Sequence, residues 1–342
     1  MSPYHFKNLI FEGGGVKGIA YVGAMEELAK REISDQIARV GGTSAGAINA
    51  VLVGLNYSLD ETRSLLWDLN FNNFMDDSWG IVRDAGRLIE SYGWYKGDFF
   101  RNWIGAVIKT KTGNSESTFA DIEAMKEKRG FKSIYFMGTN LATKFSEVFS
   151  PEHTPRMCIA DAVRISMSIP LFFAAKRSPR GDVYVDGGVL DNYPIKLFDR
   201  EKYLDIPQSG RATDYYDSIN ARFLTPDRPA SPYTFNKETL GFRLDSKEEI
   251  SLFRDQAEPV HRSIENFFDY ALALVGTITE AQQNAHLHSD DWQRTIYVDT
   301  LEVKTTQFDL SDDMKKNLVQ SGRDGVIAYF DWFDKTSTAV NK

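Results

Sequence analysis

A serine flanked by small residues is the strongest candidate for a nucleophile in this sequence. Ser44 lies in GTSAG, residues 42–46, which fits G-x-S-x-G and follows a short strand expected at 38–42. A serine that attacks a carbonyl carbon sits on a sharp turn between a strand and a helix, and small neighbours permit that turn. The helix expected at 45–55 would also favour negative charge near the serine. We therefore predict a nucleophilic serine, although a glycine-rich helix start produces the same pattern.

A serine nucleophile needs a general base, and Asp186 is the best-placed carboxylate. It ends an alternating apolar strand expected at 183–186 and precedes two glycines. A carboxylate at a strand end with glycines beside it has room to accept a proton, although a tight Asp-Gly turn without chemistry has the same sequence. The three histidines that follow it are poorer candidates, because they lie on a stretch expected to be helical, whereas a triad histidine of this order lies on a loop.

A glycine cluster near the N-terminus follows the strand expected at 7–12. Residues 13–18 read GGGVKG and fit the dinucleotide-binding pattern G-x-G-x-x-G. That interpretation requires an acidic residue at the end of the second strand to bind a ribose, and here the second strand runs into two glycines. A phosphate-binding P-loop is also excluded, because no Gly-Lys-Ser/Thr ends the cluster.

We interpret the glycine cluster as an oxyanion hole. Ester cleavage by a serine passes through a tetrahedral oxyanion, which suitably placed backbone N–H groups stabilise by about 3 kcal/mol each. Consecutive glycines leave such N–H groups uncovered. Lys17 either adds positive charge there or points into solvent. The residues expected to form the oxyanion hole and bind substrate are Gly13, Gly14, Gly15, Val16, Lys17 and Gly18.

Strands and helices alternate along the first 199 residues in a way that would bring these motifs together. Such alternation predicts an α/β fold with a largely parallel central sheet flanked by helices. Parallel neighbouring strands would place the loops after them at one carboxyl edge. Besides the elements named above, strands are expected at 133–138 and 145–149, and helices at 16–30, 97–109, 119–129 and 157–168.

Beyond about residue 200, turn-forming residues become more frequent. We expect residues 8–199 to form the catalytic domain. Residues 200–342 would form a helix-rich C-terminal extension packed on the same core, with regulation as one interpretation of its role. An amphipathic helix is expected at 259–288, with its apolar face toward the sheet or toward a lipid or partner surface.

The composition is that of an ordinary globular protein, with 42 % apolar and 26 % charged residues. The net charge of −8 does not favour nucleic-acid binding. Because Cys158 is the single cysteine and the histidines lack metal-binding spacing, we expect no intramolecular disulfide, no metal and no other cofactor. The N-terminus does not resemble a signal peptide and no run of residues is apolar enough to span a bilayer. We therefore expect a cytoplasmic protein, with export by a route that needs no cleavable signal as the open alternative.

Together, the motifs resemble those of the patatin-like phospholipase family, and of its bacterial members in particular. GGGVKG, GTSAG and DGG at 186–188 occur in the family's order, and DGGVLDNYP at 186–194 resembles its D-G-G-x-x-x-N-x-P extension. TLGFRLD at 239–245 resembles a stretch of bacterial members. The resemblance implies a three-layer α/β/α fold and a Ser-Asp dyad without histidine: Ser44 as nucleophile, Asp186 as base and the glycine loop as oxyanion hole.

The resemblance also implies a lipid acyl hydrolase of the phospholipase A1, A2 or lysophospholipase type. It would release fatty acids from membrane glycerophospholipids through an acyl-enzyme, at a membrane surface and without a cofactor. A homo-oligomer and a small-molecule or protein activator are compatible with it. The alternative is a latent or non-catalytic lipid-binding effector that requires such an activator. Aromatic residues crowd the stretch from Trp67 to Trp103 and suit a lid, an acyl channel or ordinary core packing.

Overall fold

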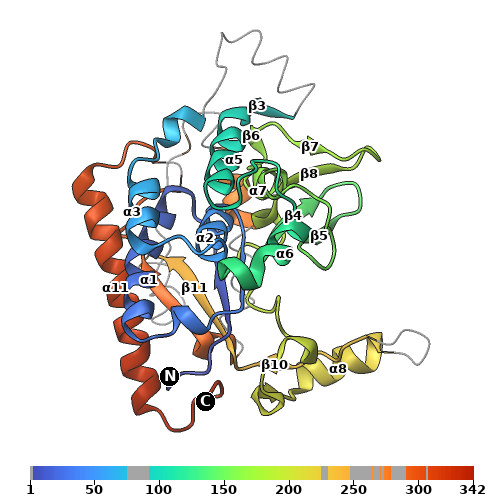
Figure 1. The fold of residues 1–342 in the computed structure, drawn as a ribbon, viewed down its shortest axis with the longest axis vertical. Helices are drawn as coiled ribbons and strands as arrows, with labels where there is room; N and C mark the ends of the chain where they lie inside the picture. Colours follow the sequence, from blue (N-terminus) through green and yellow to red (C-terminus); the bar gives the residue numbers. More distant parts are fainter. Residues whose placement is uncertain are drawn as a thin grey trace.

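The computed structural model describes residues 3–74, 92–224, 230–246, 264, 270, 273–278, 290–305 and 307–342. A central sheet runs in the order β12-β11-β1-β2-β4-β8-β7, with β5 also paired to β4 (Figure 1). Its strands are β1 (Asn8–Phe11), β2 (Arg39–Gly42), β4 (Ser133–Asn140), β5 (Phe145–Phe149), β7 (Lys176–Arg177), β8 (Val183–Asp186), β11 (Thr239–Asp245) and β12 (Thr295–Asp299).

The prediction of a largely parallel sheet is confirmed for its larger part. From β12 to β4, each strand pairs with the next in parallel. β5, β7 and β8 join in antiparallel pairs, which the alternation of strands and helices does not predict. β1 and β4 are buried along their whole length, as expected for strands covered on both faces.

Helices cover the sheet and bury most of its apolar residues. Figure 1 shows α1, α3 and α11 together on one side of the molecule, while α8 projects away from the sheet. A second, smaller hydrophobic core contains Ile10 and Tyr135 of the sheet, and apolar side chains of the segment 193–203 pack against them. The helices are α1 (Ala20–Lys30), α2 (Ala45–Gly54), α3 (Leu59–Trp67), α5 (Asp98–Thr112), α6 (Phe119–Arg129), α7 (Ile159–Ser166), α8 (Asp214–Phe223) and α11 (Asp312–Lys335).

Short elements complete the described chain. β3 (Gly93–Tyr95) pairs in parallel with β6 (Leu171–Phe173), and β9 (Gly210–Arg211) pairs with β10 (Phe235–Asn236). Single 3₁₀ turns include η1 (Gly15–Ile19), η3 (Phe71–Phe74) and η4 (Gly187–Val189). No helix among the described residues is long and apolar enough to cross a membrane.

Residues 200–342 contribute to the same sheet as the residues before them. β11 pairs with β1 and β12 pairs with β11, so two strands of this segment extend the sheet beside the first strand of the chain. The division into 8–199 and 200–342 stays a prediction. The amphipathic helix expected at 259–288 falls largely outside the described residues.

Two of the sheet's strands meet end to end. Phe136 of β4 pairs with both Gly42 and Phe149, so β2 and β5 lie on opposite sides of β4. β8 pairs with Gly138–Asn140, where β5 is also paired, so β8 shares the side of β2. Because β8 runs antiparallel, its last residue, Asp186, faces the last residue of β2. Gly42 pairs with Phe136 and Asp186 pairs with Gly138, two residues further along β4. The two strand ends are therefore separated by roughly 7 Å along β4, at the rise per residue of a strand.

The longest helix is fixed against α1 by glycines at the contact. A Cβ added to Gly23 of α1 would lie 1.8 Å from the carbonyl oxygen of Val319, and one added to Gly322 of α11 would lie 1.9 Å from that of Ala20. These distances are far below van der Waals contact, so the two backbones touch. The close approach holds α11 against the helix that follows the glycine loop.

We expect Gly322→Ala to lower the free energy of unfolding by about 1–3 kcal/mol, because the added methyl group must force the two helices apart. Gly105→Ala in α5 is the matched control, since its added Cβ meets neighbours only at 3.5 Å or more. The control should be neutral or stabilising by about 0.5–1 kcal/mol through helix propensity. Denaturant unfolding of both variants measures the difference, and equal stability would contradict the contact.

Candidate active site

Ser44 forms a sharp elbow between β2 and α2. Its φ of 54° and ψ of −126° lie outside the regions that non-glycine residues prefer, a strain of about 1–3 kcal/mol. Glycines on both sides allow the turn, because a Cβ on Gly46 would lie 2.2 Å from the carbonyl oxygen of Phe11. A Cβ on Gly42 would lie 2.3 Å from that of Gly46. This is the backbone geometry that exposes a nucleophilic oxygen at the end of a strand.

The end-to-end arrangement of β2 and β8 brings Asp186 to this elbow. The Asp186 Oδ1 accepts a hydrogen bond from the N–H of Gly188 at 2.7 Å. The other oxygen, Oδ2, is buried and has no hydrogen-bond partner within the described part of the chain. A buried acceptor without a partner is unusual. It leaves one oxygen of this carboxylate available to take a proton.

Burial raises the pKa of Asp186 to about 7, and the N–H of Gly188 and the hydroxyl of Ser44 oppose the rise. The hydroxyl is thus near enough to affect the carboxylate, although no hydrogen bond of ordinary geometry joins the two. The Ser44 Oγ instead lies 3.6 Å from the Met167 Sδ. Because a serine hydroxyl rotates freely, its hydrogen can turn from the sulfur toward the carboxylate.

The glycine loop lies directly against the elbow. A Cβ on Gly13 would lie 2.9 Å from the Cβ of Ser44. Three of the loop's N–H groups are already bonded: Gly13 donates to the Asn192 carbonyl, Val16 to the Thr305 carbonyl, and Lys17 to the Gly14 carbonyl. Gly18 packs on the first turn of α2, because a Cβ added to it would lie 3.3 Å from the Cβ of Ala45. Among the described residues, the N–H groups of Gly14 and Gly15 have no such partner.

The segment that follows Asp186 ties the three motifs together. The Asn192 side-chain amide donates to the Gly13 carbonyl at 3.1 Å and to the Glu12 carboxylate at 3.2 Å. One residue earlier, the Asp191 carbonyl accepts a hydrogen bond of 2.9 Å from the Thr43 hydroxyl. The loop from the carboxylate to Asn192 therefore holds both the glycine loop and the elbow.

A sequence profile of the patatin-like phospholipase family matches residues 9–199, the stretch that carries all three motifs. The chain belongs to the patatin-like phospholipase family. This patatin-like chain is similar to the uncharacterized protein R571 of Acanthamoeba polyphaga mimivirus, with 28 % identity over 324 residues, 94 % of this chain and 93 % of that protein. It is also similar to the probable lipid hydrolase 463L of Invertebrate iridescent virus 6, with 27 % identity over 202 residues, 58 % of this chain and 64 % of that protein.

Among solved structures, VipD from Legionella pneumophila shares the patatin-like fold of this chain. The TM-score is 0.58 at 18 % sequence identity, over 96 % of this chain and 67 % of VipD. This likeness concerns the fold alone. Since the matches include proteins of viruses as well as of bacteria, the closer resemblance to bacterial members stays a prediction.

The motif SMS, residues 166–168, supports both halves of this patatin-like site. The N–H of Ser44 donates to the Ser166 Oγ at 3.0 Å, so the amide of the elbow serine is engaged. The N–H of Asp186 donates to the Ser168 carbonyl at 2.8 Å. These residues were not predicted to belong to the site, because serine and methionine at a helix end carry no chemical signal of their own.

Sequence reasoning missed Glu12, which lies next to the glycine loop. It is fully buried at the carboxyl end of β1 and accepts a hydrogen bond from the N–H of Leu244 in β11. Burial raises its pKa to about 8, against the pull of nearby Arg243. Through Leu244 and Asn192, this carboxyl group links the loop to two other elements. An acidic residue at the end of an apolar strand was the available signal.

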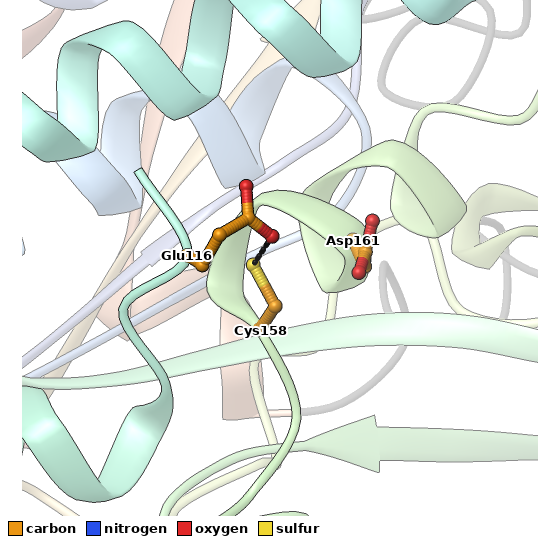
Figure 2. Close-up of side chains that lie close together, drawn as sticks. All are labelled: Glu116, Cys158 and Asp161. Atoms are coloured by element: carbon orange, nitrogen blue, oxygen red, sulfur yellow. Dashed lines mark hydrogen bonds between the residues drawn. The ribbon is translucent and has the colours of Figure 1, made fainter. Parts of the chain in front are cut away.

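A cluster of Glu116, Cys158 and Asp161 has the residue types of a metal site (Figure 2). Their potential ligand atoms lie within 4.8 Å of one another. However, the guanidinium group of Arg101 binds both carboxylates, at 2.7 Å from Glu116 and 3.0 Å from Asp161. Burial raises the pKa of the Cys158 thiol, which disfavours a thiolate ligand. We interpret the cluster as an ion-pair network in which an arginine already supplies the cation.

The raised pKa of Asp186 predicts a pH-dependent cost to stability. Its carboxyl group is protonated up to about pH 7 in the folded state but ionises near pH 4 when unfolded. Stability should therefore fall as pH rises through this interval and stay low above it. Asp186→Asn keeps the shape without the charge. It should stabilise the protein little near pH 4 and by on the order of 4 kcal/mol above pH 7.

Denaturant unfolding of the wild type and of Asp186→Asn at several pH values tests this relation. Asp182→Asn, on the residue just before β8 begins, is the control and should show no such pH-dependent gain. A gain from Asp186→Asn that did not change with pH would contradict the assignment of a high pKa to this carboxyl group.

Proposed function

We propose that this family member is a phospholipase A-type acyl hydrolase that releases fatty acids from membrane glycerophospholipids through a Ser-Asp dyad. Membership of the patatin-like phospholipase family makes the protein a lipid hydrolase. The observation that carries the finer proposal is the end-to-end arrangement of β2 and β8. It supports the proposal because the strained serine and a buried carboxylate, one oxygen of which has no hydrogen-bond partner within the described residues, lie at strand ends that face each other next to the glycine loop.

In the first step of this mechanism, the Ser44 Oγ attacks the carbonyl carbon of the acyl ester while Asp186 takes the hydroxyl proton. The oxyanion accepts hydrogen bonds from the N–H groups of Gly14 and Gly15, and the N-terminus of α2 adds its favourable dipole. Collapse of the tetrahedral intermediate breaks the bond between the carbonyl carbon and the glycerol oxygen. That oxygen takes the proton from Asp186 and leaves as the lysolipid alcohol.

In the second step, water attacks the acyl-enzyme and gives one proton to Asp186. The oxyanion forms again at the same N–H groups. The bond between the carbonyl carbon and the Ser44 Oγ breaks, and the serine recovers its proton from Asp186. The products are a fatty acid and the free enzyme, so no cofactor is needed.

Burial makes the aspartate a competent base in this mechanism. An aspartate of ordinary pKa binds protons too weakly to be efficient near neutral pH. The pKa of Asp186, raised to about 7 by burial, matches the pH at which a general base works best. The same residue then serves as the acid that protonates the leaving group.

The probable lipid hydrolase 463L, by its name, acts on lipids, and its similarity supports the same substrate class here. The burial of the dyad supports a latent form. Ser44 is 6 % and Asp186 4 % exposed, so a phospholipid ester reaches the serine only after the site opens. Contact with a membrane, a small molecule or a partner protein would provide that opening, and a latent lipid-binding effector is therefore the second candidate function.

Ser44→Ala and Asp186→Asn should each lower fatty-acid release from phospholipid vesicles by at least about 10³-fold, since each removes a group that acts in both steps. The measurement is the release of labelled fatty acid. A fluorophosphonate probe should label the wild type and fail to label Ser44→Ala. Asp217→Asn, on an exposed residue of α8, is the control and should retain activity. Full activity of Ser44→Ala would refute the nucleophile, and a labelled but lipid-inactive wild type would favour the latent effector.

We propose that two hairpins form the membrane-contacting surface. Leu141 and Phe145 flank the turn between β4 and β5 and are 48 % and 71 % exposed, with exposed Lys144 between them. The N–H of Leu141 donates to the Val183 carbonyl at 2.8 Å, so the β7–β8 hairpin, which carries exposed Arg180, lies beside this turn. Figure 1 shows both hairpins projecting from the same side. Exposed apolar and cationic groups together suit an anionic bilayer surface.

Phe145→Ser should weaken binding to anionic phospholipid vesicles about tenfold, because the aromatic ring would no longer enter the bilayer interface. Vesicle co-sedimentation of the full chain measures the effect. Phe223→Ser is the matched control, since that phenylalanine is 56 % exposed on α8, far from the two hairpins in Figure 1. Equal loss of binding in both variants would exclude the hairpins as the contact surface.

A further inference from the structure

A buried arginine lies beside the SMS motif. Arg164 belongs to the last turn of α7 and is 1 % exposed. Its Nε donates to the carbonyl of Gly97 at 3.1 Å, and its Nη2 donates to the carbonyls of Lys96 at 2.5 Å and of Ala174 at 3.1 Å. A charged group leaves water at a high cost in free energy unless it is hydrogen-bonded. These bonds therefore fix three segments to one side chain: the end of α7, the residues before α5 and the residue after β6.

The same guanidinium group holds the last residue of the motif. The Arg164 Nη1 donates to the Ser168 Oγ at 2.5 Å, and that hydroxyl donates in turn to the Arg164 carbonyl at 2.8 Å. Ser168 is fully buried, so water does not compete for these bonds. Hydrogen bonds from a charged donor are shorter and stronger than those between neutral groups. The arginine therefore attaches Ser168 firmly to the end of α7.

The motif held in this way contacts both residues of the proposed dyad. The Ser166 Oγ accepts the N–H of Ser44 at 3.0 Å, and the Ser168 carbonyl accepts the N–H of Asp186 at 2.8 Å. Between these two contacts, the Met167 Sδ lies 3.6 Å from the Ser44 Oγ. A shift of the motif would therefore change the place of the hydroxyl relative to the carboxylate.

We infer that Arg164 is a positioning residue for the reaction: through Ser168, it holds the SMS motif in the place from which the motif fixes Ser44 and Asp186. The catalytic consequence rests on the proposed function, because it presumes that a proton passes from the serine to the aspartate. Such a transfer requires the two groups at hydrogen-bonding distance. A misplacement of about 1 Å by a residue outside the chemistry lowers a rate by about 10²-fold.

The surroundings of the guanidinium group fit its planar shape. Gly97 has a φ of 70°, the left-handed conformation that favours glycine, and a Cβ on it would lie 2.4 Å from the Arg164 Nε. The Arg164 Cζ lies 5.3 Å from the centroid of the Phe173 ring in β6. A lysine would keep the charge but lacks the planar fork that reaches several acceptors in fixed directions. An exchange of arginine for lysine therefore tests the fork and leaves the charge.

Arg164→Lys should lower kcat for the monomeric ester p-nitrophenyl butyrate by about 10²-fold. KM should change less than threefold, because the motif positions the dyad and not the ester. Arg294→Lys is the matched control, since Arg294 is equally buried and pairs with Asp199 and Asp291 instead. The control should unfold more easily than the wild type and keep kcat within threefold. Equal losses of kcat in the two variants would overturn the inference.

Ser168→Ala is a milder variant that serves if Arg164→Lys fails to fold. It removes the hydroxyl but keeps the carbonyl that Asp186 uses, and it should lower kcat about tenfold. The double variant should lose about 10²-fold, because both changes act through one contact, whereas independent effects would give about 10³-fold. Ser117→Ala is its control, since that serine is buried and its hydroxyl donates to the Asn114 carbonyl at 2.9 Å. Independent effects, or equal losses in the two serine variants, would contradict the inference.

The methyl group of Met167 reports the place of the motif without turnover. In protein with isotope-labelled methionine methyl groups, its NMR signal is the one lost in Met167→Leu. Arg164→Lys and Ser168→Ala should each shift this signal, and Arg294→Lys should leave it in place. A signal that stayed in place in Arg164→Lys would show that the arginine does not hold the motif.

The two measurements separate this inference from the proposed function. If the Met167 signal shifts in Arg164→Lys but the wild type hydrolyses no ester, the arginine positions the motif and the proposed reaction fails. If the wild type hydrolyses esters and Arg164→Lys keeps its kcat, the reaction stands and Arg164 is not a positioning residue.

Discussion

The site depends on the shortness of β2. This strand has four residues and pairs with the first half of β4, so the second half of the same side is left for β8. Two strands that run in opposite directions therefore end opposite each other. Their final residues lead directly into the serine elbow and the carboxylate. A β2 longer by two residues would occupy the place of Asp186. Ser44 and Asp186 are positioned by sheet register, which packing on both faces holds fixed.

Burial of the carboxylate links chemistry to stability. Removing Asp186 from water raises its pKa and makes it a better base, and the same removal makes the folded state less stable where the group is ionised. The strained backbone of Ser44 also makes the folded state less stable. The sheet, the contact between α1 and α11 and the hydrogen bonds of Asn192 offset both. Active sites commonly combine such local instability with a stable scaffold.

Much of this arrangement could be predicted from local patterns. The strands that carry the motifs lie within a residue or two of their expected positions, because buried strands bounded by glycines have a strong signature. The antiparallel pairing of β5, β7 and β8 could not be predicted, since alternation of polarity within a strand does not distinguish parallel from antiparallel neighbours. The hydrogen-bond partners of the glycine loop could not be predicted either. Gly13 and Asn192 are 179 residues apart in sequence. Only the fold reveals that three N–H groups of the loop are engaged.

The bond between Val16 and Thr305 bears on when the enzyme can first act. The glycine loop receives this support from a residue 289 positions later in the sequence, and β1 lacks its neighbour β11 until Thr239–Asp245 has been made. On a ribosome, which releases the N-terminal part first, the serine elbow and the carboxylate emerge well before the loop has its anchors. The loop therefore acquires these anchors only after β11 and Thr305 have been made, so the proposed reaction would have to await synthesis of that later segment.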